Sequence, residues 1–141
     1  MNQIDPNKLS LDYLLENEVI AILSWDYVLE NGAEFDCEEI CWDYTWGDFK
    51  CNPDGSYYSG LLYEFYSNGT LAYYSFHKNG LRDGVDVCYY LSGELQSYRV
   101  YDKGRLAGKS YEWYENGMIK EYIDCDHNKR ILFDRQGKII K

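Results

Sequence analysis

The residues that could carry out catalysis are few and lie far apart in this chain. Only two histidines are present, His77 and His127, and neither lies in a nucleophile motif such as G-x-S-x-G. The sequence also contains no P-loop and no paired glycine fingerprint for a nucleotide. Carboxylates are abundant, but abundance alone does not place a general acid beside a general base. We therefore expect no enzymatic activity and no catalytic residue.

The possible metal ligands are equally scattered. Cys37 and Cys41 form a single C-x3-C pair, and Cys51 and the segment Cys125-Asp126-His127 are the other conceivable ligands. Structural zinc sites normally use two matched pairs, whereas this single pair lies on an expected strand. Both of its cysteines are therefore interpreted as small apolar core residues. We expect no metal site and no cofactor.

The negative charge of the chain is concentrated in its N-terminal part. The formal net charge is −10, and residues 1–60 alone hold 13 acidic and 2 basic side chains. Residues 61–141 hold 11 acidic and 12 basic side chains and are nearly neutral. An acidic surface repels nucleic acids and anionic lipids and attracts a basic protein. The alternative is that the charge only keeps a tyrosine-rich protein soluble.

Three features of the sequence concern its location. No segment reaches the ~20 apolar residues that a membrane-spanning helix needs. The first residues, Met1 to Asp5, lack the basic and then apolar pattern of a signal peptide. The five cysteines are odd in number and irregularly spaced, which is typical of free thiols in a reducing compartment. These features predict a cytoplasmic protein without a membrane partner.

The N-terminal part is predicted to form a short helix followed by a β-hairpin. Residues 9–17 have apolar side chains at helical spacing, with Ser10 as the N-cap. From residue 19 to residue 29 the apolar positions alternate, which indicates a strand. A three-residue loop at Asn31-Gly32 then matches the apolar side chains of this strand with those of residues 35–37.

This register places Asp26, Glu34, Asp36 and Glu38 on the solvent-facing side of the hairpin. Like charges that face one another across a sheet are destabilising, so their accumulation suggests a binding role. After an expected bulge at Glu38-Glu39, tryptophans enter the apolar alternation, and with Trp25 they are candidate anchors. The predicted partner-binding residues are Asp26, Glu34, Asp36, Glu38, Glu39, Asp43, Asp48, Trp42 and Trp46.

The rest of the chain repeats with a period of 24 residues. Glycines, tyrosines and aliphatic residues all recur at this spacing, and a fixed period of this size indicates a repeat architecture. The recurring tyrosines are interpreted first as a packing device between neighbouring units and second as interface anchors. The repeated sets are Gly60, Gly84 and Gly108; Gly69, Gly93 and Gly117; Tyr66, Tyr90 and Tyr114; and Tyr74, Tyr98 and Tyr122.

Turn signals within the repeats predict successive short hairpins. From Gly69 onward they are separated alternately by 11 and 13 residues, and Asn-Gly between apolar runs favours a two-residue turn with both residues at positive φ. Such a turn at Asn68-Gly69 places Tyr63, Phe65, Ala72 and Tyr74 on one face. The last unit is shortened, because Gly137 follows Gly117 by 20 residues, as is common for a terminal repeat.

The pattern Gly-x4-aromatic-Tyr-x2-Gly-x-Leu, followed by tyrosine and then Asn-Gly or Lys-Gly, resembles the MORN repeat in its bacterial variant form. The resemblance covers residues 52–141, with units that start at 60, 84 and 108, and does not include the acidic residues 1–51. It implies a mainly β fold with an elongated, twisted antiparallel meander of hairpins. We expect the N-terminal helix and hairpin to pack on the repeats in one domain, with residues 18–50 either extending the repeat sheet or folding over it. No catalytic residue comes with the resemblance.

The resemblance and the charge asymmetry together predict the function. Variant MORN proteins of bacteria are often antitoxin-like or toxin-immunity proteins, whereas eukaryotic MORN proteins are scaffolds. Nuclease toxins typically have a basic substrate-binding groove because their substrate is anionic. An acidic protein can occupy that groove in place of the nucleic acid. The sequence therefore predicts an immunity protein that occludes a basic toxin, most simply a nuclease. The alternative is a MORN-type scaffold for protein assembly.

Overall fold

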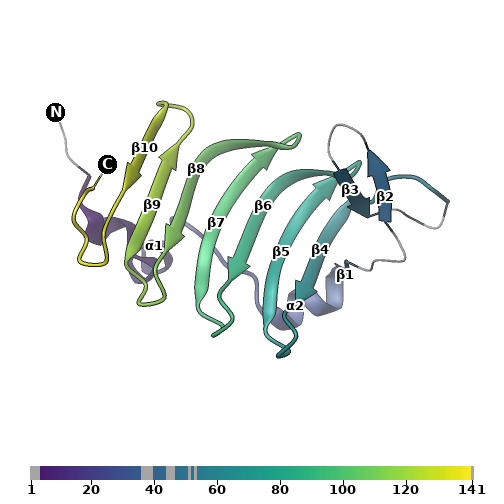
Figure 1. Ribbon diagram of the computed structural model, residues 1–141, viewed down its shortest axis with the longest axis horizontal. Helices are drawn as coiled ribbons and strands as arrows, with labels where there is room; N and C mark the ends of the chain where they lie inside the picture. Colours follow the sequence, from purple (N-terminus) through teal and green to yellow (C-terminus); the bar gives the residue numbers. More distant parts are fainter. Residues whose placement is uncertain (1–3, 36–39, 44–46, 51, 53, 141) are drawn as a thin grey trace.

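The computed structural model describes residues 4–35, 40–43, 47–50, 52 and 54–140 of this 141-residue chain. The fold is mainly β, with short helical segments before the sheet (Figure 1). The elements are η1 (Pro6–Leu9), α1 (Leu11–Glu16), α2 (Trp25–Asn31), β1 (Ala33–Glu34), β2 (Ile40–Asp43), β3 (Gly47–Lys50), β4 (Gly60–Phe65), β5 (Leu71–Lys78), β6 (Leu81–Tyr89), β7 (Leu95–Asp102), β8 (Arg105–Trp113), β9 (Ile119–Asp124) and β10 (Lys129–Leu132).

Eight of the strands form one open, twisted sheet in the order β1-β4-β5-β6-β7-β8-β9-β10. From β4 to β10 every strand pairs antiparallel with the next strand along the chain, so the predicted hairpin meander is confirmed (Figure 1). β1 is the exception, because it pairs parallel with β4 at the edge of the sheet. β2 and β3 form a separate two-stranded hairpin.

Two kinds of turn alternate along the meander. At Asn79-Gly80 both residues have positive φ, 51° and 84°, and the turn is the expected two-residue type. At Asn68-Gly69 only the glycine has positive φ, so the two-residue prediction for this turn is wrong. The Asn68 side chain accepts a hydrogen bond from the Thr70 N–H at 3.0 Å, which favours a three-residue loop closed by a glycine bulge.

The register that follows this loop is partly the predicted one. Tyr63 pairs with Tyr74 as expected, but a bulge shifts Phe65 from Ala72 to Leu71. The same irregularity recurs at Cys88/Tyr89 and at Glu112/Trp113. The bulge is therefore part of the repeat, and the loop type keeps the aromatic side chains of successive units in phase on one face of the sheet.

A hydrogen bond from one unit to the next explains one of the tyrosine sets. The Tyr66 hydroxyl donates to the carbonyl of Tyr89 at 2.6 Å, and 24 residues later the Tyr90 hydroxyl donates to the carbonyl of Trp113 at 2.6 Å. The third hydroxyl, that of Tyr114, donates to the carbonyl of Phe133 at 2.8 Å. We call these three bonds the tyrosine staples. Because each staple joins neighbouring units, this set serves the packing of the array.

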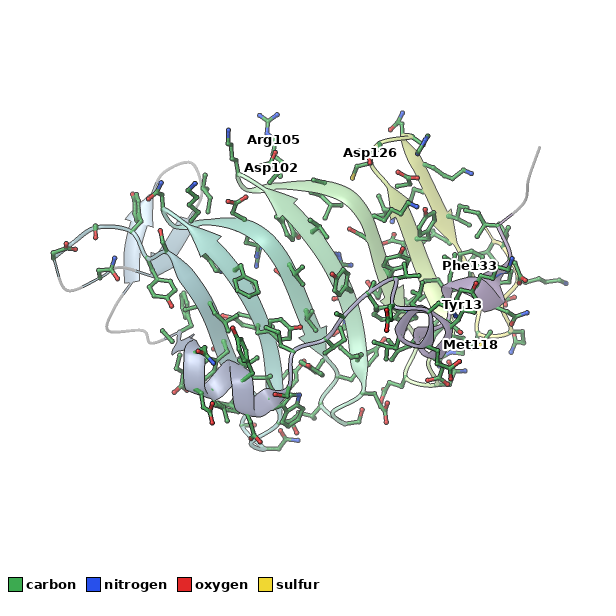
Figure 2. The ribbon with its side chains drawn as sticks, turned by 180° about the vertical axis from the view of Figure 1, so that it is seen from behind. Tyr13, Asp102, Arg105, Met118, Asp126 and Phe133 are labelled. Atoms are coloured by element: carbon green, nitrogen blue, oxygen red, sulfur yellow. The ribbon has the colours of Figure 1, made fainter. Side chains whose placement is uncertain are left out.

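The N-terminal segment crosses one face of the sheet, and Figure 2 shows α1, α2 and their connection in front of the strands. Leu14 of α1 belongs to a buried cluster with Trp113 and Phe133 at the C-terminal end of the sheet. Val28 of α2 belongs to a second cluster at the other end. The Trp113 indole N–H donates to the Leu9 carbonyl at 3.0 Å within the first cluster. The segment thus completes the core that the sheet cannot form with one layer.

The predicted helix at residues 9–17 is confirmed in type, because α1 occupies residues 11–16 and Ser10 caps it. The Ser10 hydroxyl accepts a hydrogen bond from the Tyr13 N–H at 3.3 Å. This bond satisfies one of the free N–H groups at the start of the helix.

The predicted strand at residues 19–29 and its hairpin are wrong, because residues 25–31 form helix α2. The Ser24 hydroxyl caps α2 by accepting from the Tyr27 N–H at 3.1 Å, and Val28, 0% exposed, packs on the sheet. Gly32 ends the helix, where its N–H donates to the Val28 carbonyl at 2.8 Å. A Cβ at Gly32 would lie 2.7 Å from that carbonyl oxygen. The Asn31-Gly32 pair is therefore a helix end rather than a hairpin loop.

Candidate functional site

The structure separates the acidic residues that the sequence placed on one face of a hairpin. Asp26 lies in the first turn of α2 and Glu34 lies on the edge strand β1, and both side chains are exposed. The predicted ladder between these two residues is wrong, because one of them is helical. Among the remaining predicted residues, Trp42 and Asp43 fall in β2 and Asp48 in β3, where the backbone pairs Trp42 with Asp48. Asp36, Glu38, Glu39, Trp46 and the expected bulge lie outside the described residues.

The N-terminal segment nevertheless presents an acidic surface. The sequence contains no lysine or arginine between Lys8 and Lys50. We use the name acidic strap for residues 9–34, and every acidic side chain in it is exposed. These residues are Asp12, Glu16, Glu18, Asp26, Glu30 and Glu34.

Apolar side chains lie exposed among these acids. On α2 the exposed fractions are 37% for Trp25, 48% for Tyr27 and 43% for Leu29. The Trp25 ring packs edge-on against Tyr89 at a centroid distance of 5.5 Å, which holds the indole in place. A fixed aromatic ring costs little conformational entropy on binding, so α2 combines acidic charge with anchors of the type that dominates protein interfaces.

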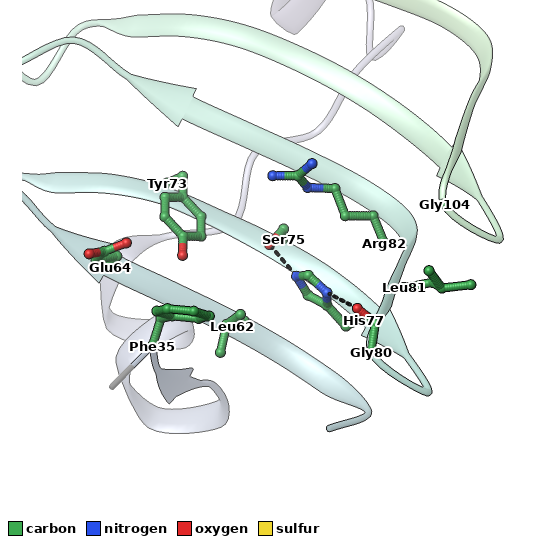
Figure 3. Close-up of a pocket in the computed structure, with 10 residues that line it drawn as sticks. All are labelled: Phe35, Leu62, Glu64, Tyr73, Ser75, His77, Gly80, Leu81, Arg82 and Gly104. Atoms are coloured by element: carbon green, nitrogen blue, oxygen red, sulfur yellow. Dashed lines mark hydrogen bonds between the residues drawn. The ribbon is translucent and has the colours of Figure 1, made fainter. Parts of the chain in front are cut away.

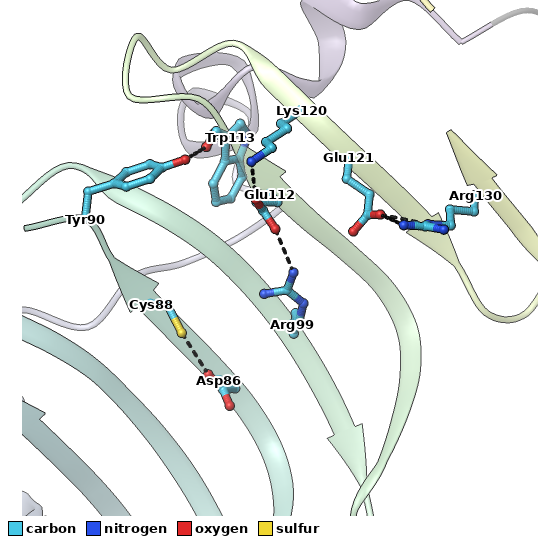
Figure 4. Close-up of polar contacts among 9 residues, drawn as sticks. All are labelled: Asp86, Cys88, Tyr90, Arg99, Glu112, Trp113, Lys120, Glu121 and Arg130. Atoms are coloured by element: carbon cyan, nitrogen blue, oxygen red, sulfur yellow. Dashed lines mark hydrogen bonds and ion pairs between the residues drawn. The ribbon is translucent and has the colours of Figure 1, made fainter. Parts of the chain in front are cut away.

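The opposite face of the sheet carries ion pairs between neighbouring strands (Figure 4). Glu112 of β8 pairs with Arg99 of β7 at 3.0 Å and with Lys120 of β9 at 3.1 Å. Glu121 of β9 pairs with Arg130 of β10 at 2.6 Å. We call this face the polar face. This face is absent from the predicted binding residues, although its acidic and basic residues alternate with the buried aromatic positions along each strand.

The polar face contains a cavity of about 400 Å³ at its N-terminal end, a volume typical of sites for small groups (Figure 3). Strands β4, β5 and β6 form its floor, and Phe35, which follows β1, forms part of its wall. We call it the β4–β6 cavity. Its lining residues are Phe35, Leu62, Glu64, Tyr73, Ser75, His77, Gly80, Leu81, Arg82 and Gly104.

His77 is held in place at the floor of this cavity. Its Nε2 lies 2.7 Å from the Ser75 hydroxyl, and its Nδ1 lies 3.4 Å from the Gly80 carbonyl (Figure 3). Burial is the main cause that lowers the pKa of His77. An uncharged ring that donates from Nδ1 to the carbonyl accepts the Ser75 proton at Nε2. Ser75 is itself buried, and its hydroxyl helps to orient the imidazole ring.

Besides Glu64, a second carboxylate lies on the cavity side, that of Asp86, and it already forms an ion pair. Arg82 Nε lies 2.9 Å from the Asp86 carboxylate. Burial is the largest influence on the pKa of Asp86 and raises it, while Arg82 acts in the opposite direction.

His127, the second histidine, lies on the β9–β10 turn and contacts Asp124 at 2.8 Å. The described residues contain no group of three or more histidine, cysteine or acidic side chains that could hold a metal ion.

Comparisons of the chain with protein-family models, with curated proteins and with solved structures gave no match. Within the part of the chain that the structure describes, no helix is both long enough and apolar enough to cross a membrane. The observations that bear on function are therefore the fold, the acidic strap and the polar face with its cavity.

Proposed function

We propose that this chain is an immunity or antitoxin protein that binds a basic protein toxin, with a nuclease as the expected class, and neutralises it in the cytoplasm. The observation that carries the proposal is the acidic strap. All six of its acidic side chains are exposed, and the sequence has no basic side chain from residue 9 to residue 49 to offset them.

The strap has the two properties that an inhibitor of a basic enzyme needs. Its uncompensated charge raises the rate of encounter with a positively charged surface and disfavours acidic partners. The exposed side chains of Trp25, Tyr27 and Leu29 then supply apolar contact area close to the charges. In this mechanism the protein covers the nucleic-acid groove of the toxin in a one-to-one complex, and no covalent chemistry is involved.

The repeats contribute a rigid support in this proposal. The open meander of hairpins is the architecture that the resemblance to variant MORN repeats implies, which supports placing the chain among immunity-type members. Two buried clusters and the Leu9–Trp113 hydrogen bond hold the strap on the sheet. A scaffold for protein assembly, the alternative function, would use the same rigid sheet but would not need a strap of a single charge sign.

The proposal is tested first by finding the partner. Tagged protein is recovered from its native cells, the co-purifying proteins are identified by mass spectrometry, and the main partner is expressed alone and with this chain in a host lacking both. We expect a basic partner that kills alone and is harmless when co-expressed. A non-toxic partner, or several partners in substoichiometric amounts, would refute the proposal and favour the scaffold.

Charge reversal then tests the surface. The triple variant Asp26→Lys, Glu30→Lys, Glu34→Lys removes half of the acids of the strap, and each of these residues is exposed, so folding is retained. We expect association with the toxin to slow by about tenfold or more at low salt, because electrostatic steering contributes at least that factor.

The matched control reverses three exposed acids in the repeats, Glu94→Lys, Asp102→Lys and Glu115→Lys, which changes the net charge equally. An equal effect of the two triple variants would show that the strap is not the docking surface. A wild-type association rate that does not change between low and high salt would contradict electrostatic docking as such.

A further inference from the structure

One position of the 24-residue repeat, on the polar face, indicates the chemical group that the β4–β6 cavity binds. Glu64, Cys88 and Glu112 are spaced by 24 residues and occupy the same position in three successive units. In the third unit, Glu112 Oε1 accepts a hydrogen bond from Arg99 and Oε2 contacts the Lys120 ammonium (Figure 4). A carboxylate at this position is therefore satisfied by cations on both sides.

In the first unit the carboxylate is present, but neither cation has a counterpart among the residues that the structure describes. The residue equivalent to Lys120, 48 positions earlier, is Ala72. On the other side of Glu64 the neighbouring strand is not a repeat strand like β7, which carries Arg99, but β1, whose described residues Ala33 and Glu34 provide no cation. Within the part of the chain that the structure describes, Glu64 forms no ion pair, whereas Asp86, Glu112 and Glu121 on the same face all do. Glu64 can therefore bind a cation of the kind that the chain itself supplies to Glu112.

The surroundings of Glu64 suit an organic cation. Glu64 lines the β4–β6 cavity, and Figure 3 shows it at the same end as the aromatic rings of Phe35 and Tyr73. Aromatic rings beside a carboxylate attract guanidinium and ammonium groups through cation–π and ionic contacts. Burial, and next the Glu64 carboxylate, raise the pKa of the Tyr73 hydroxyl, so the phenol stays protonated. The one arginine in the lining, Arg82, is offset by Asp86 at 2.9 Å.

We propose that this end of the β4–β6 cavity receives one basic side chain of the partner, with arginine favoured because its planar group can stack on the rings and contact Glu64 through two N–H groups. The proposal rests on the proposed function for its source of the cation, a basic toxin. The cavity is next to the N-terminal edge of the sheet, since its wall residue Phe35 directly follows Glu34 of the acidic strap.

The binding site is tested on the free protein, without any toxin. The ¹⁵N-labelled chain is titrated with N-acetyl-arginine amide and, in parallel, with N-acetyl-citrulline amide, which has the same shape and no charge. We expect the arginine amide to shift the amide signals of Phe35, Glu64 and Tyr73 in a saturable manner. The citrulline amide is expected to leave them in place.

Two variants identify the contact. Glu64→Gln should weaken arginine amide binding about fivefold, the upper value for an exposed ion pair, while Glu94→Gln on the β6–β7 turn should have no effect. Ala72→Lys restores the residue equivalent to Lys120, and we expect its ammonium to occupy Glu64 and to abolish binding. Glu64 is exposed and Ala72 is partly exposed, so both variants should fold.

Several results would overturn the proposal: equal shifts with citrulline amide, unchanged affinity in Glu64→Gln, or binding that survives in Ala72→Lys. Saturable shifts of His77 and Arg82 with inorganic phosphate, without a response to the arginine amide, would make the cavity an anion site instead. None of these results depends on the toxin. Failure here therefore leaves the immunity proposal intact, and a failed search for a toxin leaves this site to be judged by its own titration.

Discussion

The tyrosine staples should be a measurable source of stability, and Tyr90→Phe tests this directly. The substitution removes one hydroxyl that donates at 2.6 Å to the carbonyl of Trp113, a residue that is 0% exposed, and leaves the aromatic ring unchanged. A net intramolecular hydrogen bond contributes about 1 kcal/mol. The carbonyl that loses its donor lies on a buried residue, so we expect the loss to be about 1–2 kcal/mol.

The three staples should contribute additively. They lie two strands apart in the sheet, and with a strand spacing of about 4.8 Å the separation is about 10 Å. Substitutions at this distance usually add. The triple variant Tyr66→Phe, Tyr90→Phe, Tyr114→Phe should therefore lose about 3–6 kcal/mol in total.

The assay is urea unfolding followed by circular dichroism, with the slope m compared between variants. An unchanged m with a lower midpoint indicates lost stability in the folded state. The control is Tyr101→Phe, because the Tyr101 hydroxyl forms no hydrogen bond within the described residues and its ring contacts Arg82 at 5.5 Å. If the triple variant loses less than about 1 kcal/mol, or if Tyr101→Phe costs as much as Tyr90→Phe, the staples do not hold the units together.

Three further predictions concern other parts of the fold. Trp113→Phe removes the buried hydrogen bond to the Leu9 carbonyl and should cost about 2–3 kcal/mol in urea unfolding; a loss no larger than for a surface substitution would contradict the role of this bond. Gly117 has φ of 87° and open space where a Cβ would lie, so Gly117→Ala should cost about 1 kcal/mol from backbone strain alone and Gly117→Asn clearly less. Because burial lowers the pKa of His77, the unfolded chain binds a proton more readily, and stability should fall as pH decreases from about 7 to about 5.5. His77→Gln should reduce this pH dependence. Identical profiles of stability against pH for the wild type and the variant would show that His77 is not its source.

The sequence predicted the repeat sheet well because the repeat imposes the same local requirements several times. Glycines at the turns and aromatic residues at alternate positions recur in each unit and predict the same hairpins. A wrong interpretation of one unit therefore does not change the predicted fold. The loop at Asn68-Gly69 was predicted with one residue too few, since its bulge depends on a side-chain hydrogen bond to Thr70. The periodicity of the sequence carries no information about this hydrogen bond.

The N-terminal part was harder to predict because two periodicities fit the same residues. The alternation from residue 19 to residue 29 indicates a strand, but Trp25 and Val28 also have the spacing of one helix face. Packing of Val28 on the sheet and the Ser24 cap decide for the helix. The β4–β6 cavity could not be predicted either. It depends on the parallel pairing of β1 with β4, which brings Phe35 beside residues far away in the sequence.

The two ends of the sheet differ in a way that favours binding at the N-terminal end. At the C-terminal end, the last residues fold back on the sheet. Phe133 bridges to Ile139, and the Ile140 N–H donates to the Leu132 carbonyl at 2.8 Å. At the N-terminal end, the described residues of β1 pair with two residues of β4, Leu62 and Tyr63.

The same end carries α2 with its exposed apolar side chains and Glu64, the carboxylate whose repeat equivalent Glu112 is paired within the chain. Within the part of the chain that the structure describes, exposed acids, aromatic anchors and a carboxylate without an ion pair therefore coincide at one edge of the sheet. A repeat protein that only had to be stable would extend the Glu112 arrangement to its first unit. Among the described residues Ala72 takes the place of Lys120, and β1 takes the place of the strand that carries Arg99; the lack of both cations is most simply explained if a partner supplies the positive charge. On this reasoning Ala72→Lys should stabilise the free protein slightly while weakening its complex, and a variant that strengthened both would show that Glu64 has no role in binding.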